Sequence, residues 1–358
     1  MSEASTGATH APSRTLRALA RGARAYSRVF AASAAAPYLS RSKPVRRNGF
    51  DLDLVVSSIA AEAEDVVSFT LRRPDGGALP AWIPGAHLDV FLPSGIQRQY
   101  SLCGDPADRG CYRIAVRRID GGGGGSVAMH SEVGEGDVLT VRGPRNAFTF
   151  IDVESYLFIA GGIGITPILP MVREAARRGA DWTLVYVGRS LATMPFVAEL
   201  EAIGGGRLEL RPDDECGVPD AADLVRPAKP GAAVYVCGPP PLIEAARAVQ
   251  PSLNPTGSLH SERFSAPPVV GGRPFDVHLA RSGVTLAVGA DESALAAIRR
   301  AVPAVRYSCQ QGFCGSCKHR VLDGGVEHRD TKLRPAERET DMLICVSRAA
   351  GDRLTLDL

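Results

Sequence analysis

The sequence predicts a multidomain protein in which an antiparallel β-barrel, a parallel α/β sheet and a small α+β unit follow one another. Three observations predict this class. Residues 50–150 consist of short runs in which apolar and polar residues alternate. Beyond residue 151, strand patterns alternate with helical patterns, and closely spaced cysteines lie near the C-terminal end. With 358 residues, 45% of them hydrophobic and 22% charged, the chain is long enough for two or three separate cores.

Six strands are predicted in the first of these regions. Each is a short run of apolar and polar residues, separated from the next by Gly or Pro: DLDLVVSSIA, EDVVSFTLRR, AHLDVFLP, RQYSLCG, CYRIAVRRI and DVLTVRG. Strands of this length with turns between them are typical of a small antiparallel barrel.

From residue 151 the pattern becomes that of a parallel α/β sheet. Strand patterns (SYLFIAGG, WTLVYVG, RLELRP and AAVYVCGP) alternate with helical patterns (TPILPMVREAARRG, PFVAELEAI and PLIEAARAV). This alternation indicates parallel strands that are connected by helices.

The last unit follows a linker. SAPPVVGGRP, residues 265–274, is rich in Pro and Gly and has no periodicity, which is typical of a connection between domains. After it come the strand patterns FDVHLA and VTLAV, the helical ESALAAIRRA, the cysteine loop and the closing strand DRLTLDL. We therefore expect a third compact α+β unit.

Four cysteines of this unit are the candidate metal ligands. Cys309-x4-Cys314-x2-Cys317, with Cys345 farther along, has the plant-type spacing of a [2Fe-2S] cluster. Glycines in the loop would let backbone N–H groups turn toward the sulfurs. Zinc is the alternative, although structural zinc sites usually contain two C-x2-C pairs and this loop has one. No signal-peptide core is found, so we expect a reducing, cytoplasmic location in which a disulfide framework is not favoured.

A Gly-rich turn and a later strand end indicate a nucleotide site. AGGIGITP, which contains Gly161, Gly162 and Gly164, follows a strand and opens a helix, where backbone amides can approach a pyrophosphate. In VYVCGPPPLI, Cys237 and Gly238 end a strand of the same sheet, at the edge where nucleotides bind. A buried core thiol is the alternative interpretation of Cys237.

A second phosphate site is predicted on the barrel. In RQYSL, Arg98 could bind a phosphate and Tyr100 could form a wall for a planar ring, although the segment could also be a surface strand. Gly124, Gly125 and Ser126 could form a helical turn that receives a phosphate. The alternative for this run of five glycines is a flexible loop.

The N-terminal 47 residues are basic and the rest of the chain is acidic. They contain nine of the 41 basic residues and one of the 39 acidic ones, which leaves 32 basic and 38 acidic residues and a net charge of −6. The arginines at 14, 17, 21, 24 and 28 indicate an amphipathic basic helix. Docking on an acidic partner or an anionic membrane is one interpretation. A solvated extension is the favoured one. No apolar run is long enough to span a membrane.

The order of these motifs resembles the phthalate dioxygenase reductase family, which includes the vanillate demethylase reductases. The resemblance rests on RQYSL, GGIGITP, CGPPPLI and the plant-type cysteines, and it covers residues from about 50 to 358. It implies an FMN-binding barrel at 48–150, a ferredoxin reductase-like NAD(P)H domain at 151–266, a linker at 267–274 and a β-grasp ferredoxin domain at 275–358. Residues 1–47 lie outside the resemblance.

The resemblance also implies roles for individual residues. The implied FMN contacts are Arg98, Tyr100, Ser101, Ala115, Val116 and Arg117, with Gly124, Gly125 and Ser126 at the phosphate. The implied nicotinamide contacts are Thr166, Cys237 and Phe264, the last in HSERFS beside the flavin. Arg189 falls where the ribose 2′ position is expected, so NADPH is possible, although NADH is favoured.

The predicted function is electron transfer from NADH through FMN and a [2Fe-2S] cluster to a partner oxygenase. The seven histidines form no oxygen-activating motif, so the electrons have to leave the chain. A Rieske-type oxygenase that hydroxylates or demethylates an aromatic compound is the expected recipient. The alternatives are a haem monooxygenase partner, a free-standing flavin reductase and a zinc-stabilised binding protein. A monomer is favoured, and no nucleic-acid partner is expected.

Overall fold

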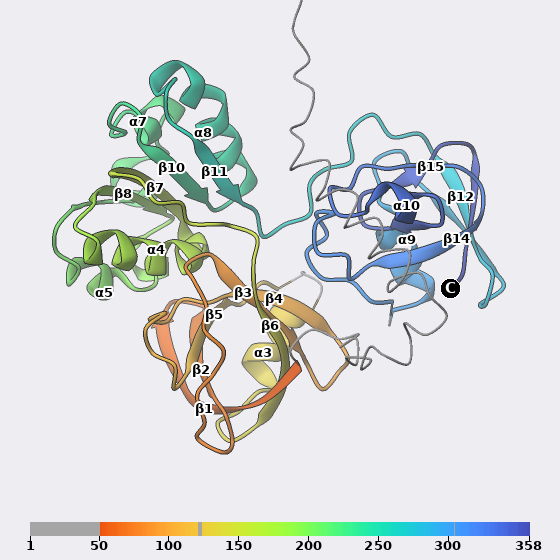
Figure 1. Cartoon of the computed structure of the whole chain (residues 1–358), viewed down its shortest axis with the longest axis horizontal. Coiled ribbons are helices and arrows are strands. Elements are labelled where there is room, and N and C mark those ends of the chain that lie inside the picture. Colours follow the sequence, from red (N-terminus) through yellow and green to blue (C-terminus); the bar gives the residue numbers. More distant parts are fainter. Residues whose placement is uncertain (1–50, 121–123, 304) are drawn as a thin grey trace, which may run out of the picture. The chain divides into compact units, whose positions relative to one another are not determined.

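The computed structural model describes residues 51–120, 124–303 and 305–358, which contain three main sheets and one two-stranded sheet. The basic helix predicted over residues 14–28 lies outside the described residues. Figure 1 shows the three main sheets following one another along the chain. The multidomain class is therefore confirmed, and the boundaries given above for the individual domains stay predictions.

The first sheet is the predicted antiparallel barrel. Its strands are β1 (Asp51–Ala63), β2 (Val66–Arg72), β3 (Ala86–Phe91), β4 (Gln97–Ser101), β5 (Tyr112–Arg117) and β6 (Val138–Asn146). They lie in the order β4-β3-β6-β1-β2-β5 with antiparallel neighbours, and a bridge between Leu102 and Ile114 joins the two edges. The apolar side chains that alternate along these strands, among them Leu54, Phe69 and Leu88, form the barrel core. All six predicted strands are present.

The second sheet is parallel, in the order β11-β10-β7-β8-β9. Its strands are β7 (Ser155–Gly161), β8 (Asp181–Gly188), β9 (Arg207–Pro212), β10 (Ala233–Cys237) and β11 (Leu259–Glu262). All five residues of β10 are buried, as expected for a strand covered on both faces. The sequence predicted four of these strands. It missed β11, because four half-buried residues with the sequence LHSE carry no apolar periodicity.

Helices cover both faces of this sheet (Figure 1). α4 (Ile165–Arg177) and α5 (Val197–Glu201) pack on one face, whereas α7 (Ala221–Val225) and α8 (Pro240–Leu253) pack on the other. The short helices η2 (Gly162–Gly164), η3 (Leu191–Thr193) and α6 (Asp213–Cys216) lie in the connections. The carboxyl ends of the parallel strands and the first turn of α4 therefore share one edge of the sheet.

The third sheet has the order β13-β12-β18-β14-β16. Its strands are β12 (Phe275–Leu279), β13 (Val284–Val288), β14 (Lys318–Asp323), β16 (Asp341–Leu343) and β18 (Arg353–Leu356). α9 (Ala294–Ala301) packs its apolar side on the core of this sheet, and the Ser293 hydroxyl caps its first turn by accepting from the Ala296 N–H at 3.2 Å. The remaining elements are β15 (Val326–Glu327), β17 (Arg348–Ala349) and α10 (Pro335–Arg338). Two strands were not predicted: β14, which directly follows the cysteine loop, and β16, which lies shortly before Cys345.

No helix of the described part is long and apolar enough to cross a membrane.

Candidate functional site

A cavity of about 500 Å³ is lined by residues from the barrel, from the region of the parallel sheet and from the region of the third sheet. It is lined by the barrel, by the start of α4, by the segment after β11 and by the cysteine loop. The sequence-predicted residues that line it are Arg98, Tyr100, Ser101, Ala115, Val116, Arg117, Gly125, Ser126, Thr166 and Phe264. Residues predicted for the flavin and residues predicted for the nicotinamide are thus gathered around one cavity.

Arg98 and the start of helix α3 (Gly125–Ser131) lie together at this cavity. Gly124, the residue before the helix, has a left-handed backbone with φ 74°, which favours glycine. A Cβ at Gly125 would lie 2.5 Å from Nε of Arg98, so a larger residue there would displace the Arg98 side chain from the start of the helix. Ser126 uses its hydroxyl locally, because it accepts from the Ile119 N–H at 3.1 Å. This leaves a cation beside a helix start, a combination that suits a phosphate.

The hydroxyl of Tyr100 is a buried polar group at the same cavity. It has no hydrogen-bond partner among the described residues, and burial raises the pKa of Tyr100 above its usual value. A buried hydroxyl without a partner is costly unless a bound group supplies one. The barrel side of the cavity, with an aromatic wall, an unsatisfied hydroxyl and a guanidinium, therefore fits an aromatic ring system that carries a phosphate.

Glu262, at the end of β11, was not predicted as a site residue. It lines the cavity, its Oε2 is buried without a partner, and burial raises its pKa to about 8 although a hydrogen bond from Ser101 acts in the opposite direction. The HSERFS segment that pointed to Phe264 contains Glu262 too, and this segment is the signal that could have revealed it. Phe264 also lines the cavity, and because it is 46% exposed, this aromatic residue is accessible from solvent.

The glycines of the Gly-rich turn have a packing role. A Cβ at Gly164 would lie 2.3 Å from the carbonyl oxygen of Cys237, and one at Gly161 would lie 2.7 Å from Cδ of Pro239. Gly238 is crowded in the same way, because its Cβ would lie 2.8 Å from Leu242. These glycines let the ends of β7 and β10 approach each other. Gly162, with φ 51°, is less crowded, because a Cβ there would lie 3.6 Å from Nη1 of Arg117, an ordinary contact distance.

The two predicted nicotinamide contacts at the edge of this sheet are both buried, and only one of them lines the cavity. Thr166 is buried at the start of α4, lines the cavity, and donates its hydroxyl to the Ile163 carbonyl at 3.0 Å. Cys237 is fully buried and does not line the cavity, and burial raises the pKa of its thiol well above the usual value. Arg189, after β8, is exposed and lies outside this cavity. Gly124, Gly161, Gly162, Gly164 and Gly238 do not line it either.

The four candidate cysteine ligands interact as two pairs, Cys309 with Cys314 and Cys317 with Cys345. Within each pair the interaction between the two thiols raises the pKa of one, Cys309 or Cys345, and lowers the pKa of the other, Cys314 or Cys317. Among the described residues, no three or more His, Cys, Asp or Glu side chains are grouped to hold one metal ion. Two pairs fit a cluster of two irons, since each iron bound to two bridging sulfides needs two thiolates.

Backbone amides of the loop point at these sulfurs. The N–H of Gln311 donates to Sγ of Cys309 at 3.3 Å, and that of Ser316 donates to Sγ of Cys314 at 3.5 Å. Gly312 has φ 80°, and a Cβ there would lie 2.7 Å from a methyl group of Val346, so the position requires glycine. N–H groups directed at sulfur stabilise negative charge on the thiolates.

The cysteine loop also forms part of the cavity wall. Cys309 lines the cavity together with residues of the same loop that were not predicted: Tyr307, Ser308, Gln310, Gln311 and Phe313. The other unpredicted lining residues are His87, Gln99, Ile119, Ile163, Glu262, Arg263, Ser265, Ala266 and Arg299. The first cluster ligand and the aromatic wall of Tyr100 therefore face the same cavity.

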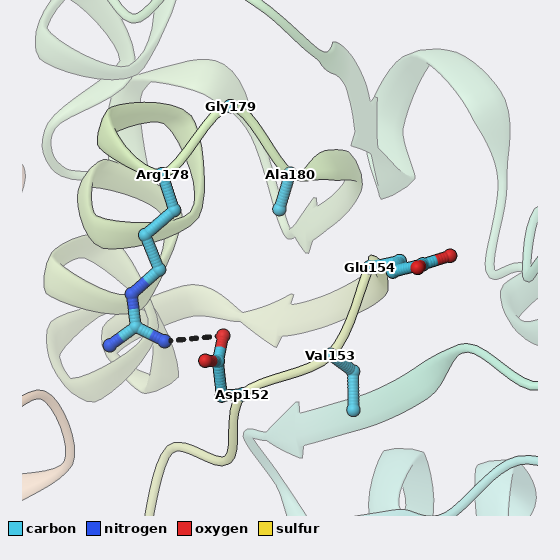
Figure 2. Close-up of a pocket in the computed structure, with 6 residues that line it drawn as sticks. All are labelled: Asp152, Val153, Glu154, Arg178, Gly179 and Ala180. Carbon is cyan, nitrogen blue, oxygen red and sulfur yellow. Dashed lines mark hydrogen bonds and ion pairs between the residues drawn. The ribbon is translucent and has the colours of Figure 1, made fainter.

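A second cavity, of about 400 Å³, lies away from this site (Figure 2). It is formed by the segment Asp152–Glu154, which precedes β7, and by Arg178, Gly179 and Ala180, which follow α4. Arg178 donates to Asp152 at 3.0 Å, and these residues belong to the amino-terminal edge of the sheet. Because open α/β sheets bind nucleotides at the carboxyl ends of their strands, we assign no cofactor to this cavity.

The C-terminal region matches a family model described as a 2Fe-2S iron-sulfur cluster binding domain, over residues 277–350. The chain is 37% identical over 321 residues to the phthalate dioxygenase reductase of Burkholderia cepacia, which covers 87% of this chain and 99% of the relative. It is 39% identical to a putative toluene-4-sulfonate monooxygenase system reductase subunit of Comamonas testosteroni, with 86% and 99% covered.

Solved structures agree with these relatives. A phthalate dioxygenase reductase, described as modular and as transferring electrons from pyridine nucleotides to [2Fe-2S], is 37% identical with a TM-score of 0.64, and 86% of this chain and 98% of that chain are covered. A full-length cytochrome P450 from Tepidiphilus thermophilus is 40% identical with a TM-score of 0.63 over 86% of this chain, which spans 42% of that protein.

An antiparallel barrel, a parallel nucleotide-type sheet and a 2Fe-2S domain in one chain define a modular iron–sulfur reductase. The chain belongs to the phthalate dioxygenase reductase family.

Proposed function

We propose that the chain is the reductase component of an oxygenase system, which carries electrons from NADH through FMN and a [2Fe-2S] cluster to an oxygenase. The observation that carries this proposal is that Cys309, Tyr100 and Phe264 line one cavity. When bound, FMN accepts a hydride and releases electrons singly, which connects a two-electron donor to a one-electron cluster.

The barrel residues hold the flavin in this proposal. Arg98 and the start of α3 at Gly124, Gly125 and Ser126 bind its phosphate, while the lining residues Tyr100, Ser101, Ala115, Val116 and Arg117 surround its ring system. The hydroxyl of Tyr100 donates to the bound flavin and thereby gains the partner it otherwise lacks.

The carboxyl edge of the parallel sheet receives the nicotinamide nucleotide. Thr166 and Phe264 position the nicotinamide at the flavin cavity, and Cys237 supports this position from below the surface. Gly161, Gly162, Gly164 and Gly238 shape the edge at which the pyrophosphate lies. Arg189 contacts the ribose side of NADH, and its charge also permits NADPH.

The cluster is bound by four cysteines, with two thiolates for each iron: Cys309, Cys314, Cys317 and Cys345. Thiolate ligands persist in a reducing compartment, so we place the protein in the cytoplasm. We treat the protein as a monomer. For the basic segment before residue 48 we keep a solvated extension as the working hypothesis and docking on an acidic partner or membrane as its rival.

Two classes of oxygenase are candidate recipients. Two relatives favour a Rieske-type oxygenase that acts on an aromatic compound: one named as a reductase subunit of phthalate 4,5-dioxygenase, at 40% identity, and one named as subunit beta of phenoxybenzoate dioxygenase, at 42% identity. A haem protein is the second candidate. It is favoured by the cytochrome P450 already described and by a haem-dependent oxidative N-demethylase beta subunit that is 40% identical over 285 residues.

The Cys314→Ser variant tests the proposed order of electron transfer. Ferricyanide can take electrons at the flavin, whereas cytochrome c takes them from the cluster. We expect the variant to lose NADH-dependent cytochrome c reduction and to keep ferricyanide reduction. Cys216→Ser, at an exposed cysteine of α6, is the matched control and should keep both activities. Equal loss of both activities in Cys314→Ser, with flavin still bound, would contradict the order.

A further inference from the structure

The two residues directly before the first cluster ligand are hydrogen-bonded to the barrel. Tyr307 accepts a hydrogen bond at its hydroxyl from Nη1 of Arg98 at 2.7 Å, and Ser308 donates its hydroxyl to Oδ1 of Asp89 at 2.7 Å. Asp89 lies on β3 and Arg98 on the paired strand β4, where Arg98 is opposite Val90. The segment that leads into Cys309 is therefore attached to two neighbouring barrel strands.

Asp89 is an unusual residue for this position. It is 0% exposed and Ser308 is 9% exposed, so the contact between them is closed to water. The carboxylate also forms an ion pair with Arg145 of β6. A buried carboxylate contributes little net stability compared with a well-packed apolar residue, although removing one of its partners is costly. Its value at this position therefore has to come from the geometry that it fixes.

We propose that Asp89 is a positioning residue for electron transfer out of the flavin cavity, because it holds Ser308 and therefore Cys309 at the cavity wall. This inference rests on the proposed function. NADH and two one-electron acceptors give NAD⁺, one proton and two reduced acceptors. The hydride enters on the nicotinamide side of the cavity, and each electron leaves through the wall that contains Cys309. The contact between Asp89 and Ser308 therefore governs the exit of electrons and not their entry.

Three variants of the holoenzyme test this assignment. Ser308→Ala removes the donor from the loop, Asp89→Ala removes the acceptor from the barrel, and Asp89→Asn keeps an oxygen that can accept from Ser308. Thr140→Ala is the matched control, because Thr140 donates its hydroxyl to Asp53 at 2.7 Å on the same barrel in an exposed pair that does not involve the loop.

Flavin reduction by NADH and the following cluster reduction are measured as separate phases by anaerobic stopped-flow absorbance. We expect Ser308→Ala and Asp89→Ala to slow cluster reduction about tenfold. The reason is that loss of one charge-assisted hydrogen bond would lower the fraction of molecules in which Cys309 is held at the cavity wall. Flavin reduction should change less than twofold, and Asp89→Asn should recover part of the lost rate. Independently of activity, amide hydrogen exchange of residues 305–311 should become faster in the two alanine variants and stay unchanged in Thr140→Ala.

The positioning role would be overturned if Ser308→Ala or Asp89→Ala folds with its iron and then shows the same rates of cluster reduction and amide exchange as Thr140→Ala. Slowing of flavin reduction to the same extent as cluster reduction would overturn it too, because the effect would then lie at the flavin. If NADH does not reduce the flavin of the unmodified protein, the proposed function itself has failed. The two failures are therefore distinguishable.

Discussion

The carbonyl oxygen of Cys237 lies where a side chain on Gly164 would have to be. A Cβ built on Gly164 would approach this oxygen to 2.3 Å and the carbonyl carbon to 2.6 Å. Gly164 ends η2 directly before α4, and Cys237 ends β10. The close approach of these two backbones therefore places the first turn of α4 at the carboxyl edge of the sheet, where the nucleotide is proposed to bind.

Gly164→Ala should destabilise the fold. The new methyl group would overlap main-chain atoms that cannot move aside as a flexible side chain can, so we expect a loss of about 1–3 kcal/mol in the free energy of unfolding. Urea unfolding of the variant measures this loss. Gly204→Ala is the control, since nothing lies within 4 Å of a Cβ there. Equal unfolding midpoints for the two variants would show that the crowding at Gly164 is unimportant.

Arg98→Ala should weaken flavin binding. A guanidinium that hydrogen-bonds to a phosphate contributes about 1.5–3 kcal/mol, so the dissociation constant for FMN should rise about 10- to 100-fold. The fluorescence of released flavin measures the affinity. Tyr307→Phe removes one hydrogen-bond partner of Arg98 but keeps the guanidinium, and Arg142→Ala removes an arginine that pairs with Asp51 outside the cavity. Both controls should keep their FMN, and an unchanged affinity in Arg98→Ala would remove this residue from the site.

Arg348→Met should destabilise the 2Fe-2S domain. Arg348 is 1% exposed, and its guanidinium donates to the carbonyl oxygens of Arg273, Gly289 and Glu292. Methionine fills similar space but leaves these buried oxygens without partners, so we expect a loss of about 2–4 kcal/mol. Guanidinium chloride unfolding followed by the cluster absorbance measures it. Arg281→Met breaks only the exposed pair with Asp357 and should leave the stability nearly unchanged.

Glu262 should make the stability of the flavin-free protein fall as the pH rises. Its pKa is raised from the ordinary value of 4.5 to about 8, mainly by burial. Below pH 4.5 both folded and unfolded chains are protonated at this carboxyl. Between pH 4.5 and 8 the unfolded chain releases the proton while the folded chain keeps it, so stability is lost progressively over this window, on the order of 5 kcal/mol in total.

Glu262→Gln removes this titration and should flatten the pH dependence between pH 4.5 and 8. The measurement is a series of urea unfolding midpoints across that window. Glu201→Gln, at an exposed carboxylate of α5, should keep the slope of the unmodified chain. A slope that is the same in Glu262→Gln would mean that the carboxyl is ionised in the folded protein at neutral pH.

The sequence predicted the fold well where side chains alternate regularly. The six barrel strands and β7, β8, β9 and β10 carry apolar periodicity, and all of them are present. β11 was missed because LHSE carries no apolar alternation, and β16 was missed because a strand of three residues is too short to show one. β14 was missed because KHRVLD begins with three polar or charged residues directly after Cys317 and resembles loop.

The site was predictable only where a motif marks it. Arg98 and Tyr100 lie in RQYSL and Phe264 in HSERFS, and all three line the cavity. Tyr307 and Ser308 carry no motif, because their importance arises from the position of the cysteine loop against the barrel. The requirement for glycine at Gly164 was expected from ligand approach, whereas the structure shows that packing against another strand end requires it. The roles assigned to individual cofactor-binding residues stay predictions.

The central claim is that electrons enter at the flavin and leave through a [2Fe-2S] cluster. An anaerobic titration of the purified protein with NADH, followed by visible absorbance and electron paramagnetic resonance together with metal analysis, tests it most directly. We predict a protein that contains iron and flavin, whose flavin absorption is bleached by NADH and whose reduced cluster then gives a paramagnetic signal. A colourless protein that contains zinc, or a flavin and cluster that NADH leaves oxidised, would contradict the claim.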